Sequence, residues 1–240
     1  MFYETSLPIT EATESPHSHR EWWGGMNKQT IIQGDCLEVM KTFADKSFDL
    51  VLTDPPYGLE KFGSWDTFDQ GFHEEWLSEC NRLLKDNGQM YVFWGHFYLE
   101  AFLCMCWHDA IIYWMKPKPI INPKSRRWVA SVEHILWWHK GKEYTWNFPA
   151  HPTELCNVFK DSLAKQKEGK SYHRNQKPLS VINKLIERST NEGDTILDPF
   201  LGSGTTLVAA KQLNRNAVGI EISPEYCEIA RKRLEQQTLL

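Results

Sequence analysis

The stretch TDPPYG, residues 53–58, places reactive and rigid residues directly after the apolar run SFDLVL. That run predicts a buried strand, and the two prolines that follow fix the backbone at the point where it leaves the strand. Asp54 supplies a carboxylate, Tyr57 supplies a flat ring for stacking, and Gly58 frees the next loop to move. The pattern therefore predicts a site in which geometry matters more than a covalent nucleophile.

A second candidate site lies in LDPFLGSGTTLVAA, residues 197–210, which reads as a strand, a glycine turn and a helix. Gly202 and Gly204 let the backbone approach a ligand, and the helix presents its free N–H groups there. Glu221, in the strand VGIEI, can accept two hydrogen bonds from ribose hydroxyls. The P-loop pattern is absent, and Leu207 replaces the third glycine of the dinucleotide fingerprint. The loop thus indicates a nucleoside cofactor without a pyrophosphate, such as S-adenosylmethionine. The alternative is an ordinary turn of small residues.

Both sites together fit transfer of a methyl group to the exocyclic amine of adenine or cytosine. The lone pair of that nitrogen is delocalised into the ring, so an enzyme must orient it with two acceptors for its two N–H bonds. The Asp54 carboxylate and the Pro55 carbonyl are the two acceptors that we expect. The predicted catalytic residues are Asp54, Pro55, Pro56 and Tyr57.

DPPY together with DPFLGSGTT resembles the S-adenosylmethionine-dependent DNA amino-methyltransferases that act on adenine N6 or cytosine N4. GDCLEVM, NQKPLSVINKLIERST and AVGIEISPEYCEIARKRL also match that family's pattern, and the resemblance covers about residues 30–234. DPPY precedes the cofactor loop, as in the circularly permuted β arrangement of the family. The resemblance implies an α/β fold with a doubly wound, mostly parallel, seven-stranded, Rossmann-like sheet. The alternation of predicted strands and helices indicates the same class.

The resemblance also implies which residues hold the cofactor. Asp35 and Cys36 should border its adenine, Glu221 its ribose, and residues 198–206 its methionine part. Lys177 is expected at the methionine carboxylate, with a surface lysine at a helix start as the alternative. The predicted cofactor-binding residues are Asp35, Cys36, Lys177, Asp198, Pro199, Phe200, Gly202, Gly204, Thr205, Thr206 and Glu221.

The sequence predicts a flexible N-terminal extension over residues 1–27 and a methyltransferase domain over residues 28–240. A short DNA-recognition region is expected as an insertion at about residues 116–176. Its stretch KPKPIINPKSRRW carries basic side chains and no acid, a composition that suits phosphate contacts, although a solvated loop is the alternative. The predicted DNA-binding residues are Lys116, Lys118, Lys124, Arg126 and Arg127.

Composition excludes several further classes of protein. The net charge of -4 argues against a protein that coats nucleic acid, and the chain shows neither a signal peptide nor an apolar run long enough for a bilayer. The six scattered cysteines form no CxxC, so we expect reduced thiols and no metal site. A cytoplasmic enzyme of a prokaryote, or of a phage in a bacterial host, is the expected setting. Double-stranded DNA is the expected partner, and a homodimer is left open.

The resulting hypothesis is a site-specific adenine-N6 DNA methyltransferase of the restriction-modification type that flips its target base out of the duplex. The aspartate form of the tetrapeptide favours adenine in this family, and cytosine N4 is the alternative. Cytosine C5 chemistry is disfavoured because no Pro-Cys pair occurs. A nicotinamide-dependent oxidoreductase is a more remote alternative, because it leaves DPPY unexplained.

Overall fold

The structure, a computed structural model, describes residues 29–57, 69–116, 128, 130–160 and 176–236. An eight-stranded sheet has the order β1-β8-β7-β2-β3-β5-β4-β6. Strands β1, β8, β7, β2 and β3 are parallel to one another, and β5 is antiparallel to both β3 and β4. The strands are β1 (Gln29–Gln33), β2 (Phe48–Thr53), β3 (Leu84–Trp94), β4 (Ala110–Met115), β5 (Val132–His139), β6 (Val158–Phe159), β7 (Thr195–Asp198) and β8 (Asn216–Glu221).

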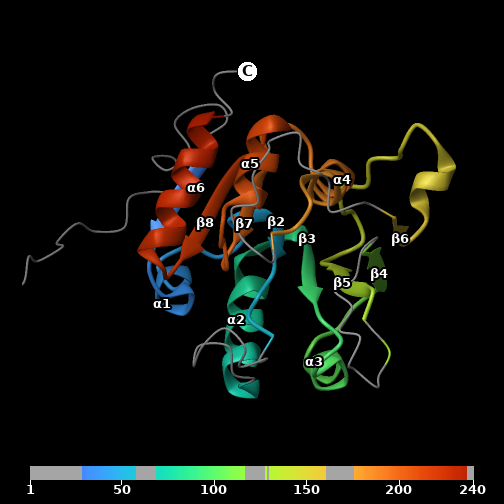
Figure 1. The fold of residues 1–240 in the computed structure, drawn as a ribbon, viewed down its shortest axis with the longest axis horizontal. Helices are drawn as coiled ribbons and strands as arrows, with labels where there is room; N and C mark the ends of the chain where they lie inside the picture. The colour runs from blue at the N-terminus through green and yellow to red at the C-terminus, as the bar shows by residue number, and fades with distance from the viewer. Residues whose placement is uncertain (1–28, 58–68, 117–127, 129, 161–175, 237–240) are drawn as a thin grey trace, which may run out of the picture.

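Helices cover both faces of this sheet, as Figure 1 shows with α1, α2 and α3 on one side and α4, α5 and α6 on the other. Each side has its own apolar core, one built with Trp76 and Phe102 and the other with Ile186 and Leu207. The predicted doubly wound α/β fold is therefore confirmed. The helices are α1 (Cys36–Met40), α2 (Gln70–Leu83), α3 (Leu99–Met105), α4 (Leu179–Ser189), α5 (Thr205–Gln212) and α6 (Pro224–Gln236), with a short 3-10 helix at Pro152–Leu155.

Hydrophobic spacing explains these elements. In α4, Val181, Ile182, Leu185 and Ile186 are buried, a spacing that places them on one face of a helix. In β2, all residues but Asp49 are buried, as expected for a parallel strand covered by helices on both faces. In the described part of the chain, no helix combines the length and apolar character that crossing a membrane requires.

One feature differs from the predicted seven-stranded sheet. An eighth strand, β6, pairs with β4 and lies within the range 116–176. A strand of two residues carries no periodicity, so no local pattern could predict it. Strand β5 also falls within the range 116–176 and lies between β3 and β4 in the main sheet, and the expected insertion stays a prediction. The predicted extension, residues 1–27, lies outside the described residues.

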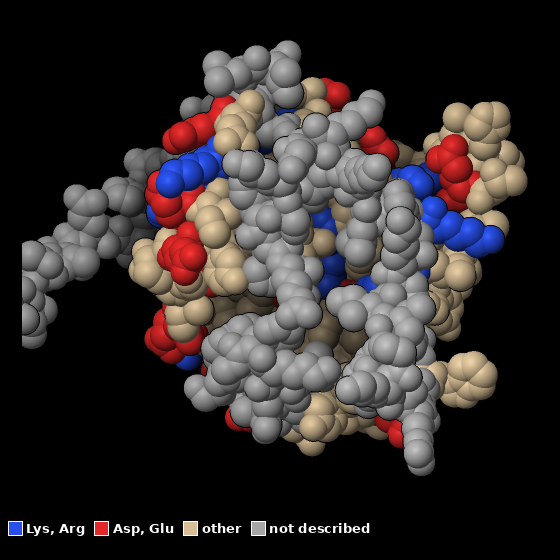
Figure 2. Space-filling view, in the orientation of Figure 1, with Lys and Arg blue, Asp and Glu red and all other residues tan. Residues whose placement is uncertain are grey.

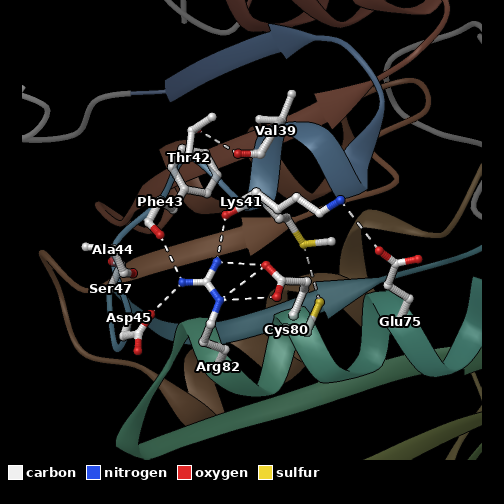
Figure 3. Close-up of polar contacts among 12 residues, drawn as sticks. Val39, Lys41, Thr42, Phe43, Ala44, Asp45, Ser47, Glu75, Cys80 and Arg82 are labelled. Carbon is white, nitrogen blue, oxygen red and sulfur yellow. Dashed lines mark hydrogen bonds and ion pairs between the residues drawn. The ribbon is translucent and has the colours of Figure 1, made fainter. Parts of the chain in front are cut away.

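Arg82, near the end of α2, ties that helix to the turn after α1 (Figure 3). Its guanidinium donates to the carbonyls of Met40 and Phe43 at 2.9 and 3.0 Å, and pairs with Glu79 at 2.7 Å. The Met40 carbonyl, at the end of the five-residue helix α1, also accepts from the Phe43 amide at 3.1 Å, so Arg82 adds a second donor there and reaches the Phe43 carbonyl in the turn that follows. These bonds thereby fix the helix that begins after Asp35, a predicted cofactor residue.

Replacing Arg82 with Met should lower the free energy of unfolding by about 2 kcal/mol, because two carbonyls lose the charged donor Arg82 and Glu79 loses its counter-charge. Urea unfolding followed by tryptophan fluorescence measures this. The matched control is Arg231→Met, which breaks a more exposed, 3.8 Å pair with Glu228 and should cost at most about 0.5 kcal/mol. Equal losses in both variants would contradict the role given to Arg82.

Candidate active site

The predicted catalytic tetrapeptide begins directly after β2, between the ends of β7 and β3. Pro55 is buried, Tyr57 is half-buried, and the Asp54 side chain remains 29% exposed. The hydroxyl of Thr53 donates to Asp198 at 2.8 Å, which links the end of β2 to the end of β7. The two motifs recognised in the sequence thus meet at one edge of the sheet, although they lie far apart along the chain.

The ring of Tyr57 is held in place by its neighbours. It packs against Trp94 with ring centroids 5.3 Å apart, and it lies so close to Gly95 that an added Cβ there would stand 3.1 Å from the ring. Its hydroxyl donates to the Asp54 carboxylate and also lies 2.9 Å from Glu133. One phenol carries one proton, so the two carboxylates share this donor.

Lys177 lies at the centre of the site. Its Nζ is 2.6 Å from Asp54 Oδ2, 2.5 Å from Glu133 Oε1 and 3.2 Å from the Tyr57 hydroxyl. The side chain is only 9% exposed, and Lys177 directly precedes Pro178, the N-cap residue of α4. The predicted contact of Lys177 with a cofactor carboxylate stays a prediction, and the ion pairs observed here are with protein carboxylates.

The charged groups around Lys177 shift one another's pKa values. Burial alone would raise the pKa of Glu133, but the ammonium groups of Lys177 and Lys116 outweigh it and lower the pKa to about 2. Burial raises the pKa of Asp54, and Lys177 opposes that rise. Burial, together with the nearby carboxylates, also raises the pKa of the Tyr57 hydroxyl well above its ordinary value, so Tyr57 stays a donor. The cluster is therefore a set of buried ions that balance one another.

Glu133 is the site residue that sequence reasoning missed. It is the second residue of β5, and because β5 is antiparallel to β3, the beginning of β5 lies beside the end of β3. Lys116 follows β4 at the same edge and lies 2.5 Å from Glu133 Oε2. The sequence held one signal for Glu133, an acid in an otherwise apolar and aromatic strand, but strand direction was needed to place it.

The predicted adenine and ribose residues meet at the neighbouring ends of β1 and β8. Asp35 caps α1 by accepting from the backbone amides of Leu37 and Glu38. The Glu221 carboxylate accepts from the amides of Gly202 and Ser223, both at 2.8 Å. Glu221, at the end of β8, thus fixes the glycine turn by accepting a hydrogen bond from its backbone.

The surroundings of Glu221 fit a nucleoside. Above Gly202, an added Cβ would meet no atom within 4 Å, so the turn faces open space. Ile222 follows Glu221 and is 70% exposed, which offers an apolar surface for a base. Sequence reasoning did not single out Ile222, although an apolar residue after a strand-end acid was visible.

The other predicted cofactor residues are mostly buried. Burial raises the pKa of the Cys36 thiol to about 12 and that of Asp198 to about 6, although Asp198 accepts bonds from Thr53 and from the Phe200 amide. Cys36 belongs to the apolar core, so it contacts α2 rather than solvent. Pro199, Thr205 and Thr206 are buried, and Phe200 packs against Trp76. Their roles in cofactor binding stay predictions.

Of the predicted DNA-binding residues, Lys118, Lys124, Arg126 and Arg127 lie outside the described residues. Lys116 is described, and its ammonium pairs with Glu133. On the face drawn in Figure 2, basic and acidic side chains of the described residues lie side by side at both margins. Phosphate binding by the predicted set stays a prediction.

Known proteins share both the sequence pattern and the fold. Residues 48–232 match the N6/N4 methyltransferase family, described as DNA methylase. The chain is 33% identical to the Type II methyltransferase M.HinfI of Haemophilus influenzae, over 86% of this chain and 68% of that protein. It is 31% identical to the Type II methyltransferase M2.MboI of Moraxella bovis, over 87% and 88% of the two chains.

Two solved structures are similar in fold. The M1.HpyAVI–SAM complex has a TM-score of 0.71 and 31% identity, and the match covers 86% of this chain and 98% of that one. The PvuII cytosine-N4-specific DNA methyltransferase has a TM-score of 0.70 at 22% identity, and covers 88% and 90%. The second likeness concerns the fold alone.

Two glycines of the turn provide a matched test of where the cofactor lies. Gly204 has φ 85° and an added Cβ would stand 2.7 Å from the Cβ of Ala230, whereas Gly202 has φ 53° and faces open space. Gly204→Ala should therefore lower the free energy of unfolding by about 2–3 kcal/mol, and Gly202→Ala by about 1 kcal/mol. Thermal unfolding compares them.

Calorimetric titration with S-adenosylmethionine supplies the second measurement. Gly202→Ala should weaken binding by about tenfold or more, because the new methyl group enters the space assigned to the cofactor. Unchanged affinity in this variant would place the cofactor elsewhere.

Proposed function

The chain belongs to the N6/N4 family of S-adenosylmethionine-dependent DNA methyltransferases, and we propose that it methylates the N6 amine of adenine in double-stranded DNA. The observation that carries the proposal is the position of Asp54. Its carboxylate stands on a rigid proline turn, beside the strand end that carries Asp198, and accepts a hydrogen bond from the Tyr57 hydroxyl. This is where an amine would have to meet a methyl donor bound at the ends of β7 and β8.

Bound S-adenosylmethionine supplies an electrophilic methyl group on a sulfonium. The residues of this chain orient the amine: Asp54 accepts one N–H bond, and the Pro55 carbonyl accepts the other. Two acceptors in a fixed geometry turn the nitrogen lone pair toward the methyl group. The ring of Tyr57, already braced by Trp94, stacks on the flipped base. The new N–C bond would replace the bond between the methyl group and the sulfonium sulfur, leaving a neutral thioether, and the adjacent Asp54 carboxylate is placed to accept the proton that the amine releases.

Adenine is supported by the DPPY form of the motif and by the larger stacking surface that its two rings offer to Tyr57. Adenine N6 and cytosine N4 present the same two hydrogens, so the acceptor pair itself does not choose between them. The PvuII methyltransferase, named as cytosine-N4-specific, has a similar fold, and cytosine N4 is therefore the second candidate.

The relatives of Haemophilus influenzae and Moraxella bovis are Type II methyltransferases, which supports a modification enzyme that acts in the cytoplasm of a bacterium or of a phage-infected cell. The basic stretch 116–127 would bind the phosphates of duplex DNA. The target base would then reach Asp54 by leaving the stack.

Replacing Asp54 with Ala should reduce methyl transfer by about 10³-fold, because the amine loses its charged acceptor. Binding of S-adenosylmethionine should hardly change, and Lys177 keeps Glu133 as a counter-ion, so the fold should survive. Transfer of tritiated methyl groups to plasmid DNA measures turnover. The matched control is Asp86→Ala, which removes an exposed carboxylate paired with Lys46 and should leave the rate unchanged. Near-normal turnover in Asp54→Ala would refute the proposed chemistry.

The base is identified by digesting the methylated DNA and analysing its nucleosides by mass spectrometry. We expect N6-methyladenine. N4-methylcytosine as the sole product would replace adenine by cytosine in the proposal and leave the role of Asp54 standing.

A further inference from the structure

The carboxylate that should receive the target amine is already occupied by donors of the protein. Asp54 Oδ1 accepts from the Tyr57 hydroxyl, and Asp54 Oδ2 lies 2.6 Å from the ammonium of Lys177. An ammonium and an exocyclic amine are both nitrogen donors, so they compete for the same acceptor. Each carboxylate oxygen can accept a second hydrogen bond, but an amine that takes the place of one of these donors on Asp54 displaces that donor.

Moving Lys177 into an apolar surrounding would carry a large cost. Its ammonium lies over the rings of Tyr57 and Phe93, at 5.5 and 5.2 Å from their centroids, and the side chain is almost fully buried. A buried cation without a counter-charge is strongly disfavoured. A second carboxylate within reach removes this cost.

Glu133 is that second carboxylate. Its Oε1 lies 2.5 Å from Lys177 and 2.9 Å from the Tyr57 hydroxyl, so it already contacts both donors that occupy Asp54. Its side chain is 5% exposed, and its Oε2 is fixed by Lys116 at 2.5 Å. Strand β5, paired on both edges, holds Glu133 rigidly.

We propose that Glu133 is a positioning residue for methyl transfer: it retains the Lys177 ammonium and the Tyr57 hydroxyl when the target amine takes their places on Asp54. Before the substrate binds, the Lys177 ammonium occupies the position on Asp54 that the target amine takes later. When the amine displaces it, the ammonium stays paired with Glu133. This inference rests on the proposed role of Asp54 as the amine acceptor. No proton transfer between Lys177 and Glu133 is required, because both stay ionised.

Glu133→Gln tests the charge at constant shape, since the amide oxygen still accepts from Tyr57. Asp54 becomes the remaining carboxylate beside Lys177, so displacement of the ammonium leaves a buried cation uncompensated. The single-turnover rate constant, at saturating S-adenosylmethionine and DNA and about pH 8, should fall by about tenfold or more. The dissociation constants of both ligands should stay within about twofold of the original, because Glu133 contacts neither in this account.

Loss of charge balance could by itself destabilise the fold. In the Lys116→Met background, Glu133→Gln restores equal numbers of positive and negative groups among Asp54, Lys116, Glu133 and Lys177. The loss in rate caused by Glu133→Gln should persist in that background. Its disappearance there would overturn the proposal.

A double-mutant cycle with Lys177→Met separates positioning from a merely structural role. Without the ammonium only the neutral Tyr57 hydroxyl is left to be displaced, so the contribution of Glu133 to the rate constant should vanish in a Lys177→Met background. Glu133→Gln should then change the rate constant by less than about twofold in this background. The same loss in both backgrounds would overturn the proposal.

The amplitude of the single turnover reports the fraction of active enzyme. A purely structural role of Glu133 lowers the amplitude and leaves the rate constant unchanged, and that result also counts against the proposal. Asp54→Ala is run beside these variants. If it stays active, the proposed function itself fails. If it is inactive while Glu133→Gln behaves like the original enzyme, only the inference about Glu133 fails.

Discussion

The buried ammonium of Lys177 is the interaction on which the site depends. It joins three segments that are distant in the sequence: Asp54 after β2, Glu133 in β5, and the start of α4. A buried cation without a counter-charge is strongly disfavoured, so the ammonium can be buried only when the segments that carry Asp54 and Glu133 lie beside it. Those ion pairs therefore place the proposed acceptor carboxylate and the base of α4 in one fixed arrangement.

Sheet direction supplies the rest of the site. Parallel strands β1, β8, β7 and β2 end at one edge, which brings Asp35, Glu221, Asp198 and Asp54 into one row. Antiparallel β5 contributes its first residues to the same edge, so Glu133, near the amino end of β5, lies close to Asp54, which follows the carboxyl end of β2. Open α/β sheets place ligand sites beyond the carboxyl ends of their strands, and this protein follows that rule.

Much of this could be predicted from the sequence. Strand β2 lies where the apolar run SFDLVL predicted it, and the strand, turn and helix predicted in residues 197–210 appear as the end of β7, the glycine turn and α5, because burial on a sheet or helix face leaves a local pattern. The two motifs were found for the same reason: their spacing is local. Glu133 and the ion-pair partners of Lys177 could not be predicted, since both depend on strand order and on the antiparallel direction of β5. Strand β6 has only two residues and leaves no periodic signal.

The most direct test of the account is a crystal structure of the enzyme with duplex DNA and an unreactive analogue of S-adenosylmethionine. We predict a flipped base stacked on Tyr57, its amine within about 3 Å of an Asp54 oxygen, and the Lys177 ammonium beside Glu133 and no longer on Asp54. A flipped base bound elsewhere, with Lys177 still paired to Asp54, would contradict the central claim that this carboxylate receives the target amine.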